Sequence, residues 1–206
     1  NATEWQVPPI KAKTEGQTII INKNVPQSAI IFADQGLLRN DPDFYAAYVM
    51  NHILGGAGFT SRLYSEVREK RGLAYSISSS LSPRQASSIL VGGAGTSNAR
   101  VKEALKVIKT QWQRMAVDGV AEDELNDAKT YLTGAYPLRF SESGRIAQIL
   151  VGIQLDGLSP SYIQKRNDFI AVVTRKDISR IAKKVLNAKR LVTIVVGQPR
   201  GLQPSQ

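Results

Sequence analysis

The strand-like segments of this chain are few, and long stretches that favour helices separate them along the sequence. Runs rich in β-branched or alternating apolar residues occupy positions 18–21, 29–33, 73–82, 87–95 and 191–196. The third and fourth runs flank Ser82-Pro83-Arg84-Gln85 and predict an antiparallel hairpin. Because strands so distant in sequence must share one sheet, the pattern predicts an α+β two-layer domain: a mixed or antiparallel sheet with helices packed on one face.

Helical periodicity fills the intervals between these runs. Asn40-Asp41-Pro42 predicts a helix start, with apolar spacing that continues until Gly55-Gly56, and a second helix is expected over 61–70. Further helices are expected over 101–118 with Asn98 as its cap, over 121–135, over 141–157, from Pro160, and from a Thr174 cap with Asp177 three residues on. We therefore predict a linker or N-terminal arm at 1–16, a single domain at 17–199 and a tail at 200–206.

Composition limits the chemistry that this chain can perform. Among 206 residues there is no cysteine, and His52 is the only histidine. Disulfides, thiolate metal sites, a cysteine nucleophile and zinc sites built on two or three histidines are therefore excluded within it. The sequence contains no run of about 18 apolar residues, so no membrane span is predicted. We interpret His52, on the apolar side of the first helix, as a structural histidine, because the sequence supplies no partners for a ligand or base.

A glycine-rich stretch, Leu54-Gly55-Gly56-Ala57-Gly58-Phe59, precedes the second helix. It resembles a phosphate-binding loop only superficially, because it lacks the Lys-Ser/Thr ending and follows a helix instead of a strand. We therefore predict that Gly55, Gly56 and Gly58 form a flexible loop that lets the main chain approach a partner surface or an extended peptide.

The densest polar stretch runs from Ser61 to Tyr75. A solvated helix face explains Glu66 and Lys70, which stand four residues apart. It explains less well why Arg68, near the helix end, is followed seven residues later by Tyr75 at a strand start. A guanidinium and a phenol brought together there would hold a peptide carbonyl or a developing oxyanion, so both are candidate substrate-binding residues.

The net charge is +10, from 27 Lys and Arg against 17 Asp and Glu. The basic excess is concentrated late, at Lys165, Arg166, Arg175, Lys176, Arg180, Lys183, Lys184, Lys189 and Arg190. Such a face attracts nucleic acid or steers an acidic partner. Aromatic residues are not interleaved with these charges, and no nucleic-acid-binding signature is present, so we favour a solvated basic face.

Several of these segments together resemble the C-terminal half of the pitrilysin-type (insulinase-like, inverzincin) peptidases, which include the mitochondrial processing peptidase. The resemblance covers about residues 17–199 and depends on the order of its motifs. They are Leu54-Gly55-Gly56, Ser61-Arg62-Leu63, the run from Val67 to Ser76, the run from Leu138 to Ser143, the run from Gly157 to Tyr162, Val173-Thr174 with Asp177-Ile178, and Val195-Val196-Gly197-Gln198-Pro199.

This resemblance implies a peptidase made of two homologous α+β halves that close into a clam-like chamber. One half carries zinc on a His-x-x-Glu-His motif, which this chain lacks. The metal-free half supplies an Arg and a Tyr, seven residues apart, and Arg68 and Tyr75 match that pair in type and spacing. The chain is thus expected to bind and orient peptide or unfolded polypeptide for a zinc-carrying partner half, as a separate subunit or as part of one chain. The partner's zinc would activate water, with a Glu as general base.

The main alternative is a non-catalytic structural or peptide-binding subunit, because subunits of respiratory complexes that are similar to this family serve as core proteins. A nucleic-acid-binding protein ranks third. The resemblance and the absence of an initiator Met favour a bacterial periplasmic or exported setting, although the composition fits a cytosol or a mitochondrial matrix equally well. Neither a cofactor in this chain nor a nucleic-acid partner is expected.

Overall fold

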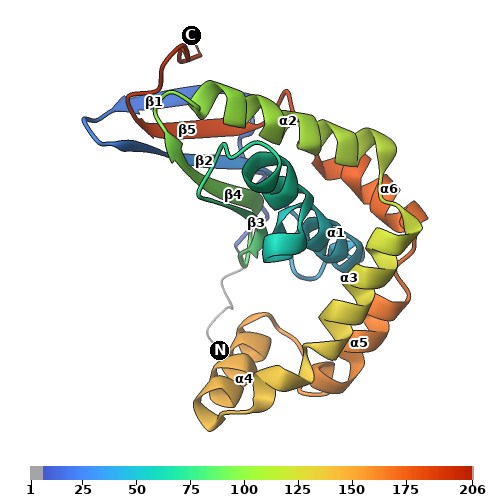
Figure 1. The fold of residues 1–206 in the computed structure, drawn as a ribbon. Coiled ribbons are helices and arrows are strands. Elements are labelled where there is room, and N and C mark those ends of the chain that lie inside the picture. Colours follow the sequence, from blue (N-terminus) through green and yellow to red (C-terminus); the bar gives the residue numbers. More distant parts are fainter. Residues whose placement is uncertain (1–6, 206) are drawn as a thin grey trace.

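The computed structural model describes residues 7–205, which fold around one five-stranded mixed sheet in the order β1-β5-β2-β4-β3 (Figure 1). The strands are β1 (Thr18–Asn22), β2 (Gln27–Gln35), β3 (Ser76–Pro83), β4 (Ser88–Ser97) and β5 (Val192–Gly197). β1 runs parallel to β5, and the other neighbours are antiparallel. The predicted hairpin is β3–β4, and the closing strand β5 inserts between β1 and β2. The α+β class and the mixed sheet are confirmed.

Helices cover one face of this sheet and extend beyond it as an arm. In Figure 1, α2 runs from the sheet outwards and α6 packs under its far part and against α1, while α3 and α5 pack together and carry α4 at the far end. The helices are α1 (Phe44–Asn51) with a π-helical turn η1 (His52–Gly56), a 3-10 turn η2 (Gly58–Thr60), a π-helical segment η3 (Tyr64–Glu69), α2 (Val101–Asp118), α3 (Glu122–Gly134), a 3-10 turn η4 (Pro137–Phe140), α4 (Ser143–Leu155), α5 (Tyr162–Ala171) and α6 (Arg175–Val185).

The core lies between the sheet and these helices. Along β4, buried and partly exposed residues alternate without interruption, as a strand with one covered face requires. Phe32 of β2 meets Trp112 of α2 edge to face, with ring centroids 5.6 Å apart. Asp34, fully buried beneath them, accepts hydrogen bonds from Trp112 Nε1 (3.2 Å) and the Asn187 main-chain N–H (2.7 Å), and pairs with Arg190 (3.3 Å). A carboxylate this deep is tolerated because it is fully partnered.

The opposite face of the sheet is open and apolar over β1, β5 and β2. The register places Ile19, Ile194 and Ile31 in one row across these three strands, and Ile31 is 52% exposed. Towards β4 and β3 the same row continues with Gly93 and Ser78. Exposed apolar side chains that gather on one face mark a surface suited to a further layer of protein.

Two predicted helix caps have different outcomes. Thr174 caps α6 as predicted. Thr174 Oγ1 accepts from the Asp177 main-chain N–H at 3.2 Å, and the Asp177 carboxylate accepts from the Thr174 main-chain N–H at 3.0 Å. The prediction for Asn98 is wrong. Its Oδ1 accepts from Ser28 Oγ at 2.6 Å and its Nδ2 donates to the Val25 carbonyl at 3.0 Å. Asn98 therefore ties the start of β2 to the end of β4.

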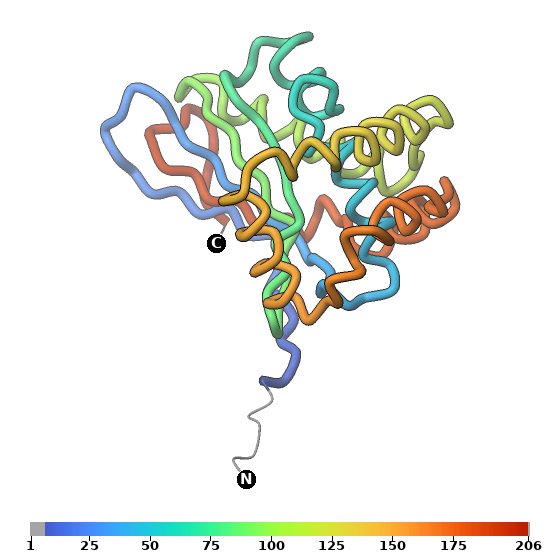
Figure 2. Tube along the Cα trace, turned by 90° about the horizontal axis from the view of Figure 1, so that it is seen from below, coloured from blue at the N-terminus to red at the C-terminus, as the bar shows by residue number. Residues whose placement is uncertain are grey.

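The far end of the arm is poorly buried. α4 has a single buried residue, Ile153, whereas Val151 and Leu155 on the same helix are exposed. Figure 2, seen from below, shows α4 at a distance from α2 and α6. Within residues 7–205, no helix has the length and apolar character needed to cross a bilayer.

The chain before β1 forms no helix or strand between residues 7 and 17. Three main-chain hydrogen bonds tie it to the domain: the Ile10 N–H donates to the Ala86 carbonyl (2.6 Å), the Gly16 N–H to the Arg190 carbonyl (3.1 Å) and the Thr193 N–H to the Gln17 carbonyl (2.7 Å). The boundaries at 16 and 199 remain predictions.

Candidate functional site

Arg68 and Tyr75 lie on either side of the turn that joins η3 to β3. Gly72 makes this turn with a φ of +59°, a left-handed conformation that glycine adopts without strain. The Leu73 N–H donates to the Val67 carbonyl at 2.8 Å, which closes the end of η3. The Tyr75 main-chain N–H then donates to the Gly95 carbonyl at 2.9 Å and begins the pairing of β3 with β4. The turn is therefore fixed at both ends.

Both candidate side chains face solvent beside this turn. Arg68 is exposed, and Tyr75 is 63% exposed. Arg68 Nη1 donates to the Tyr64 hydroxyl, and its guanidinium carbon lies 4.8 Å from the centroid of the Tyr64 ring. Within the described residues, no side-chain hydrogen bond joins Arg68 to Tyr75. The structure therefore orients Arg68 through Tyr64, and joint action of Arg68 and Tyr75 stays a prediction.

Tyr64 is a member of this site that sequence reasoning missed. Its ring is buried and meets the exposed Phe59 edge to face, with centroids 5.0 Å apart. Tyr64 and Arg68 are four residues apart, which places them on one face of a helix. This spacing is the sequence feature from which the contact between Tyr64 and Arg68 could have been predicted. Tyr64 provides a fixed platform from which the Arg68 guanidinium reaches solvent.

The three glycines do not form one loop, so this prediction is corrected. Gly55 and Gly56 belong to η1, which continues α1, and only Gly58 lies in the turn that follows. A Cβ on Gly55 would lie 2.3 Å from Ser79 Oγ and 2.9 Å from the Ser79 main-chain nitrogen, so glycine is needed there for close packing against β3. Gly58 has a φ of +56° and open space where its side chain would lie. Glycine at 55 serves packing, and glycine at 58 serves the turn.

His52 is buried at the start of η1, as predicted for a structural histidine. Its ring stacks on Tyr131 with centroids 5.2 Å apart. Burial lowers the pKa of His52, so the ring is neutral at pH 7. Among residues 7–205, no three His, Cys, Asp or Glu side chains gather where they could hold a metal ion. The residues present therefore do not fit a zinc site, and no step through a metal is assigned to this chain.

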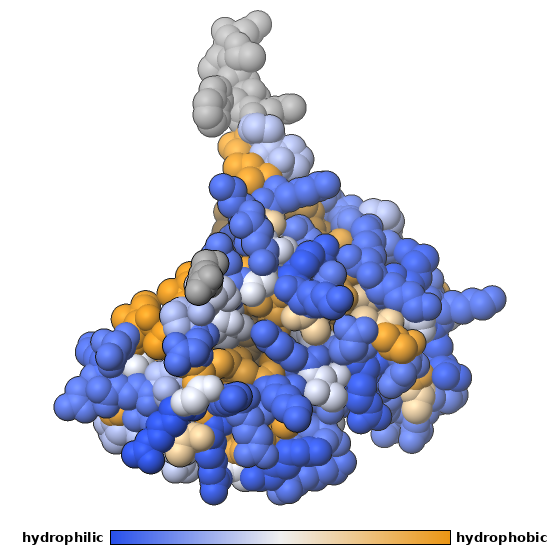
Figure 3. Space-filling model, turned by 90° about the horizontal axis from the view of Figure 1, so that it is seen from above, coloured by the Kyte–Doolittle hydropathy of each residue, from blue (hydrophilic) through white to orange (hydrophobic). Residues whose placement is uncertain are grey.

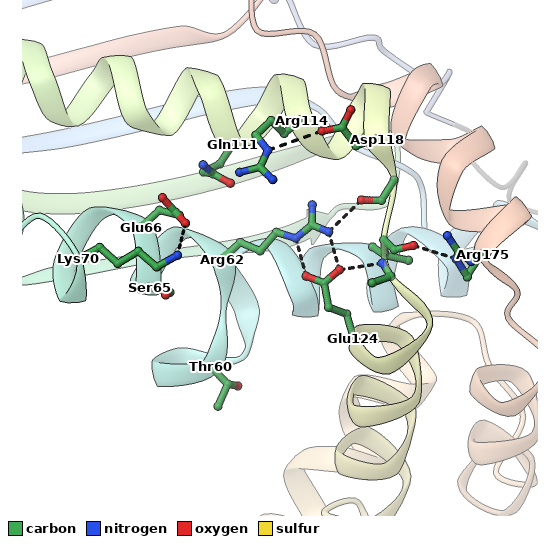
Figure 4. Close-up of a pocket in the computed structure, with 13 residues that line it drawn as sticks. Thr60, Arg62, Ser65, Glu66, Lys70, Gln111, Arg114, Asp118, Glu124 and Arg175 are labelled. Carbon is green, nitrogen blue, oxygen red and sulfur yellow. Dashed lines mark hydrogen bonds and ion pairs between the residues drawn. The ribbon is translucent and has the colours of Figure 1, made fainter.

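A cavity of about 570 Å³ lies in the corner between η3, the end of α2 and the start of α3 (Figure 4). Arg62 spans this corner: its Nε donates to Glu124 Oε1 at 2.7 Å and its Nη2 to the Gly119 carbonyl at 2.9 Å. Burial alone would raise the pKa of Glu124, but hydrogen bonds from Arg62 and the Ala121 N–H outweigh it and hold the pKa below its ordinary value. The two charges at the centre of this corner, Arg62 and Glu124, neutralise each other.

A second cavity, of about 400 Å³, lies between α1, the end of β3 and the arm. We call it the aromatic pocket. Phe44, Tyr45 and Tyr48 of α1 and Tyr162 of α5 supply its rings, and Arg39, Arg139 and Arg166 supply its positive charge. Asp156 is the one carboxylate among its lining residues, and it pairs with Arg39 at 3.4 Å. Sequence reasoning missed this pocket, because its walls come from four separate segments of the chain.

The late basic residues are partly neutralised. Arg180 pairs with Asp43 at 2.6 Å and with Asp177 at 3.2 Å, and Arg190 pairs with Asp34. On the face seen in Figure 3, hydrophilic residues are spread between smaller apolar patches. This local pairing fits a solvated face for the exposed members, but the prediction is wrong for Arg166, which is 5% exposed because it packs between α3 and α1.

A family model described as the peptidase M16 inactive domain matches residues 1–132. An uncharacterized zinc protease of Streptomyces coelicolor is 30% identical over 183 residues, which are 89% of this chain and 40% of the relative. One of Mycobacterium leprae is 33% identical over 153 residues, which are 74% of this chain and 34% of the relative. The chain thus spans less than half the length of these relatives.

Solved structures agree with this match. A crystal structure of a peptidase M16 inactive domain from Pseudomonas fluorescens superposes with a TM-score of 0.85 and 28% identity, covering 100% of this chain and 48% of that one. A protease from Helicobacter pylori superposes with a TM-score of 0.81, covering 96% of this chain and 48% of the other. Its 19% identity shows the fold alone.

Proposed function

Because the chain belongs to the family of the peptidase M16 inactive domain, we propose that it binds polypeptide substrate and orients it for a zinc-carrying partner half in a clam-like chamber. The observation that carries this proposal is the pair of exposed side chains, Arg68 and Tyr75, at the two ends of one rigid turn. Both are hydrogen-bond donors on a fixed framework, and this is what recognition of peptide carbonyls requires.

The proposed roles divide between the two side chains. Arg68, oriented by its contact with Tyr64, donates from its remaining N–H groups to a substrate carbonyl or to the oxyanion that forms during cleavage. The Tyr75 hydroxyl donates to the same substrate segment. The Gly58 turn and the exposed ring of Phe59 lie beside Tyr64 and border this surface. The metal and its activated water belong to the partner half.

Two open surfaces are suited to contact with that half. One is the apolar row Ile19, Ile194 and Ile31 on the uncovered face of the sheet, and the other is the exposed apolar side of α4. Since the chain spans 40% of the Streptomyces relative, more than half of that relative's length is available to cover such surfaces. The partner half is either a separate subunit or another part of the same polypeptide.

The test is turnover by the assembled enzyme with Arg68→Ala in this chain. Loss of a preorganised oxyanion donor lowers kcat by about 10²-fold, and the zinc content should stay at the wild-type level. Arg84→Ala, an exposed arginine at the far end of the hairpin, is the matched control and should leave cleavage unchanged. Equal cleavage by wild type and Arg68→Ala would refute the assigned role.

The alternative, a non-catalytic structural subunit, makes a different prediction for the same preparation. In that case the complex that contains this chain has no peptide cleavage that a chelator abolishes. Chelator-sensitive cleavage by the complex supports the substrate-binding half, and its absence supports the structural subunit.

A further inference from the structure

The aromatic pocket contains a buried positive charge that nothing in the described protein neutralises. We propose that this pocket binds the carboxylate of a peptide, with Arg166 as the anion's buried partner. That the carboxylate belongs to a peptide rests on the proposed function, whereas the anion site itself rests on the pocket alone.

Arg166 of α5 is 5% exposed. Its Nη1 donates to the Leu132 carbonyl at 3.0 Å and to Asn167 Oδ1 at 3.2 Å, and its Nη2 donates to the Tyr48 hydroxyl at 3.3 Å, so all three acceptors are neutral. The rings of Tyr48 and Tyr136 lie against the guanidinium, with centroids 5.6 Å and 4.2 Å from its central carbon. No Asp or Glu among residues 7–205 comes within 4.0 Å of its nitrogens. Buried arginines are almost always paired with an anion, so this one has a vacant partner position.

The other charges of the pocket do not fill that position. Asp156 is already engaged by Arg39, whose guanidinium also lies 4.3 Å from the centroid of the Phe44 ring. Arg139 is exposed and has no ion-pair partner within the described residues. Arg139 and Arg166 therefore leave the pocket with two uncompensated positive charges. A carboxylate matches the planar fork of a guanidinium better than a compact anion does.

The shape of the pocket indicates a peptide end or a side chain. Its volume of about 400 Å³ is near the lower end of the range for ligand cavities. One wall is Ser80 and Leu81 of β3, an edge strand that pairs only with β4 within the described chain. An extended peptide lying along such an edge would place one residue, with aromatic rings around it, in front of Arg166.

The experiment is calorimetric titration of the full 206-residue chain with three short peptides of Ala and Phe. The first has a free C-terminal carboxylate, the second has a C-terminal amide, and the third has the amide and one internal Glu. The first should bind more tightly than the second by at least about 10-fold, as a charge-assisted hydrogen bond to a buried guanidinium provides. If the third binds as well as the first, the pocket accepts a carboxylate from either a side chain or a terminus, and if the third binds like the second, the pocket selects the peptide terminus.

Two variants connect this binding to the pocket. Arg166→Gln removes the buried charge and keeps a polar side chain, and Arg139→Gln removes the exposed charge. Each should weaken the carboxylate peptide by about 10-fold and leave the amide peptide unchanged. Arg145→Gln, exposed on α4 and outside the pocket, is the control with the same change in charge.

The proposal is overturned if the three peptides bind equally, if none binds, or if Arg166→Gln binds the carboxylate peptide like wild type. These outcomes are distinct from failure of the proposed function. Arg68→Ala reports on the latter through cleavage, at a surface that shares no lining residue with this pocket.

Discussion

Arg62 and Arg166 are both arginines held against helices inside the domain, but their surroundings differ. The Arg62 guanidinium meets both oxygens of Glu124 and the Gly119 carbonyl. Arg166 lies between tyrosine rings, donates to a main-chain carbonyl, the Asn167 amide oxygen and a hydroxyl, and has no carboxylate partner in the described protein. The first arrangement is complete and holds two helices together. The second is satisfied as a hydrogen-bond donor but not as a charge.

The difference follows from where the carboxylates lie. Glu124 stands in the first turn of α3, where its Oε2 also accepts from the Ala121 N–H at 2.8 Å, so the helix start itself fixes this carboxylate. Near Arg166 the chain places tyrosines instead, and Asp156 is held by Arg39. Removing one partner of a complete ion pair leaves the other charge without its partner, whereas removing an unpaired charge does not. Measurements of stability, and of its dependence on pH, test this contrast.

The largest loss of stability is expected for Glu124→Gln. The change leaves the Arg62 guanidinium without its anion and weakens the cap on α3. Because the two side chains are 20% and 30% exposed, solvent reduces the cost, which we expect to be about 2 kcal/mol. For a chain of this size that is a fall in Tm of about 4–8 °C by scanning calorimetry.

The matched control is Glu122→Gln on the same helix. Glu122 is exposed and lies 3.9 Å from Arg175, a surface pair that contributes little. A loss below about 0.5 kcal/mol is expected for this control. If Glu124→Gln and Glu122→Gln unfold at the same denaturant concentration, the Arg62–Glu124 pair contributes no more to stability than the surface pair of Glu122 with Arg175.

A smaller loss is expected for Arg166→Gln, no more than about 1 kcal/mol of the free energy of unfolding in urea. The substitution strands no carboxylate, and the acceptors that lose their donor are neutral. A loss as large as that of Glu124→Gln would show that Arg166 is a structural residue with a partner of its own. That result would remove the distinction between the two regions.

The smallest expected effect is a change of stability with pH that comes from His52, which lines the aromatic pocket. Burial lowers the pKa of His52 in the folded state, so the unfolded chain takes up a proton first as the pH falls below the ordinary value of 6.5. The contribution of His52 is complete above that pH and is lost below it. The Tm of wild type should therefore fall between about pH 7 and about pH 5.5, and His52→Asn should flatten this part of the curve.

The corner should respond in a different pH range. The pKa of Glu124 is held below its ordinary value of 4.5, so its contribution persists above that pH and is lost only as the pH falls further. Glu124→Gln should flatten the acid end of the curve and leave the region near pH 6 unchanged. If His52→Asn and Glu124→Gln flattened the same part of the curve of Tm against pH, the separation of the two regions would be contradicted.

Much of the fold could be predicted from local pattern. The five strand-like runs match β1 to β5 within a few residues, and the Thr174 cap is present in α6. Asn98 shows where local reasoning fails. A capping residue before a helix is a good local signal, but this side chain bonds Ser28, 70 residues away, and Gln198, 100 residues away. Long-range partners outcompeted the local donor.

The candidate site divides in the same way. The sequence predicts Arg68 near a helix end and Tyr75 at a strand start, and the structure has them there, while their role as a substrate-binding pair stays a prediction. The glycine loop was not predicted correctly, because its first glycine is fixed by Ser79 of β3, a contact that no local pattern encodes. Tyr64 was within reach of sequence reasoning, since it stands four residues before Arg68.

The sequence by itself determined the class of fold and the placement of Arg68 at a helix end and Tyr75 at a strand start, because periodicity and short spacing are local properties. Only the tertiary structure decided which arginine has an anion. Arg62 meets Glu124 across 62 residues of chain, and Arg166 meets Tyr48 across 118. Charge pairing depends on distance in space, and that distance is set by how the helices pack on the sheet.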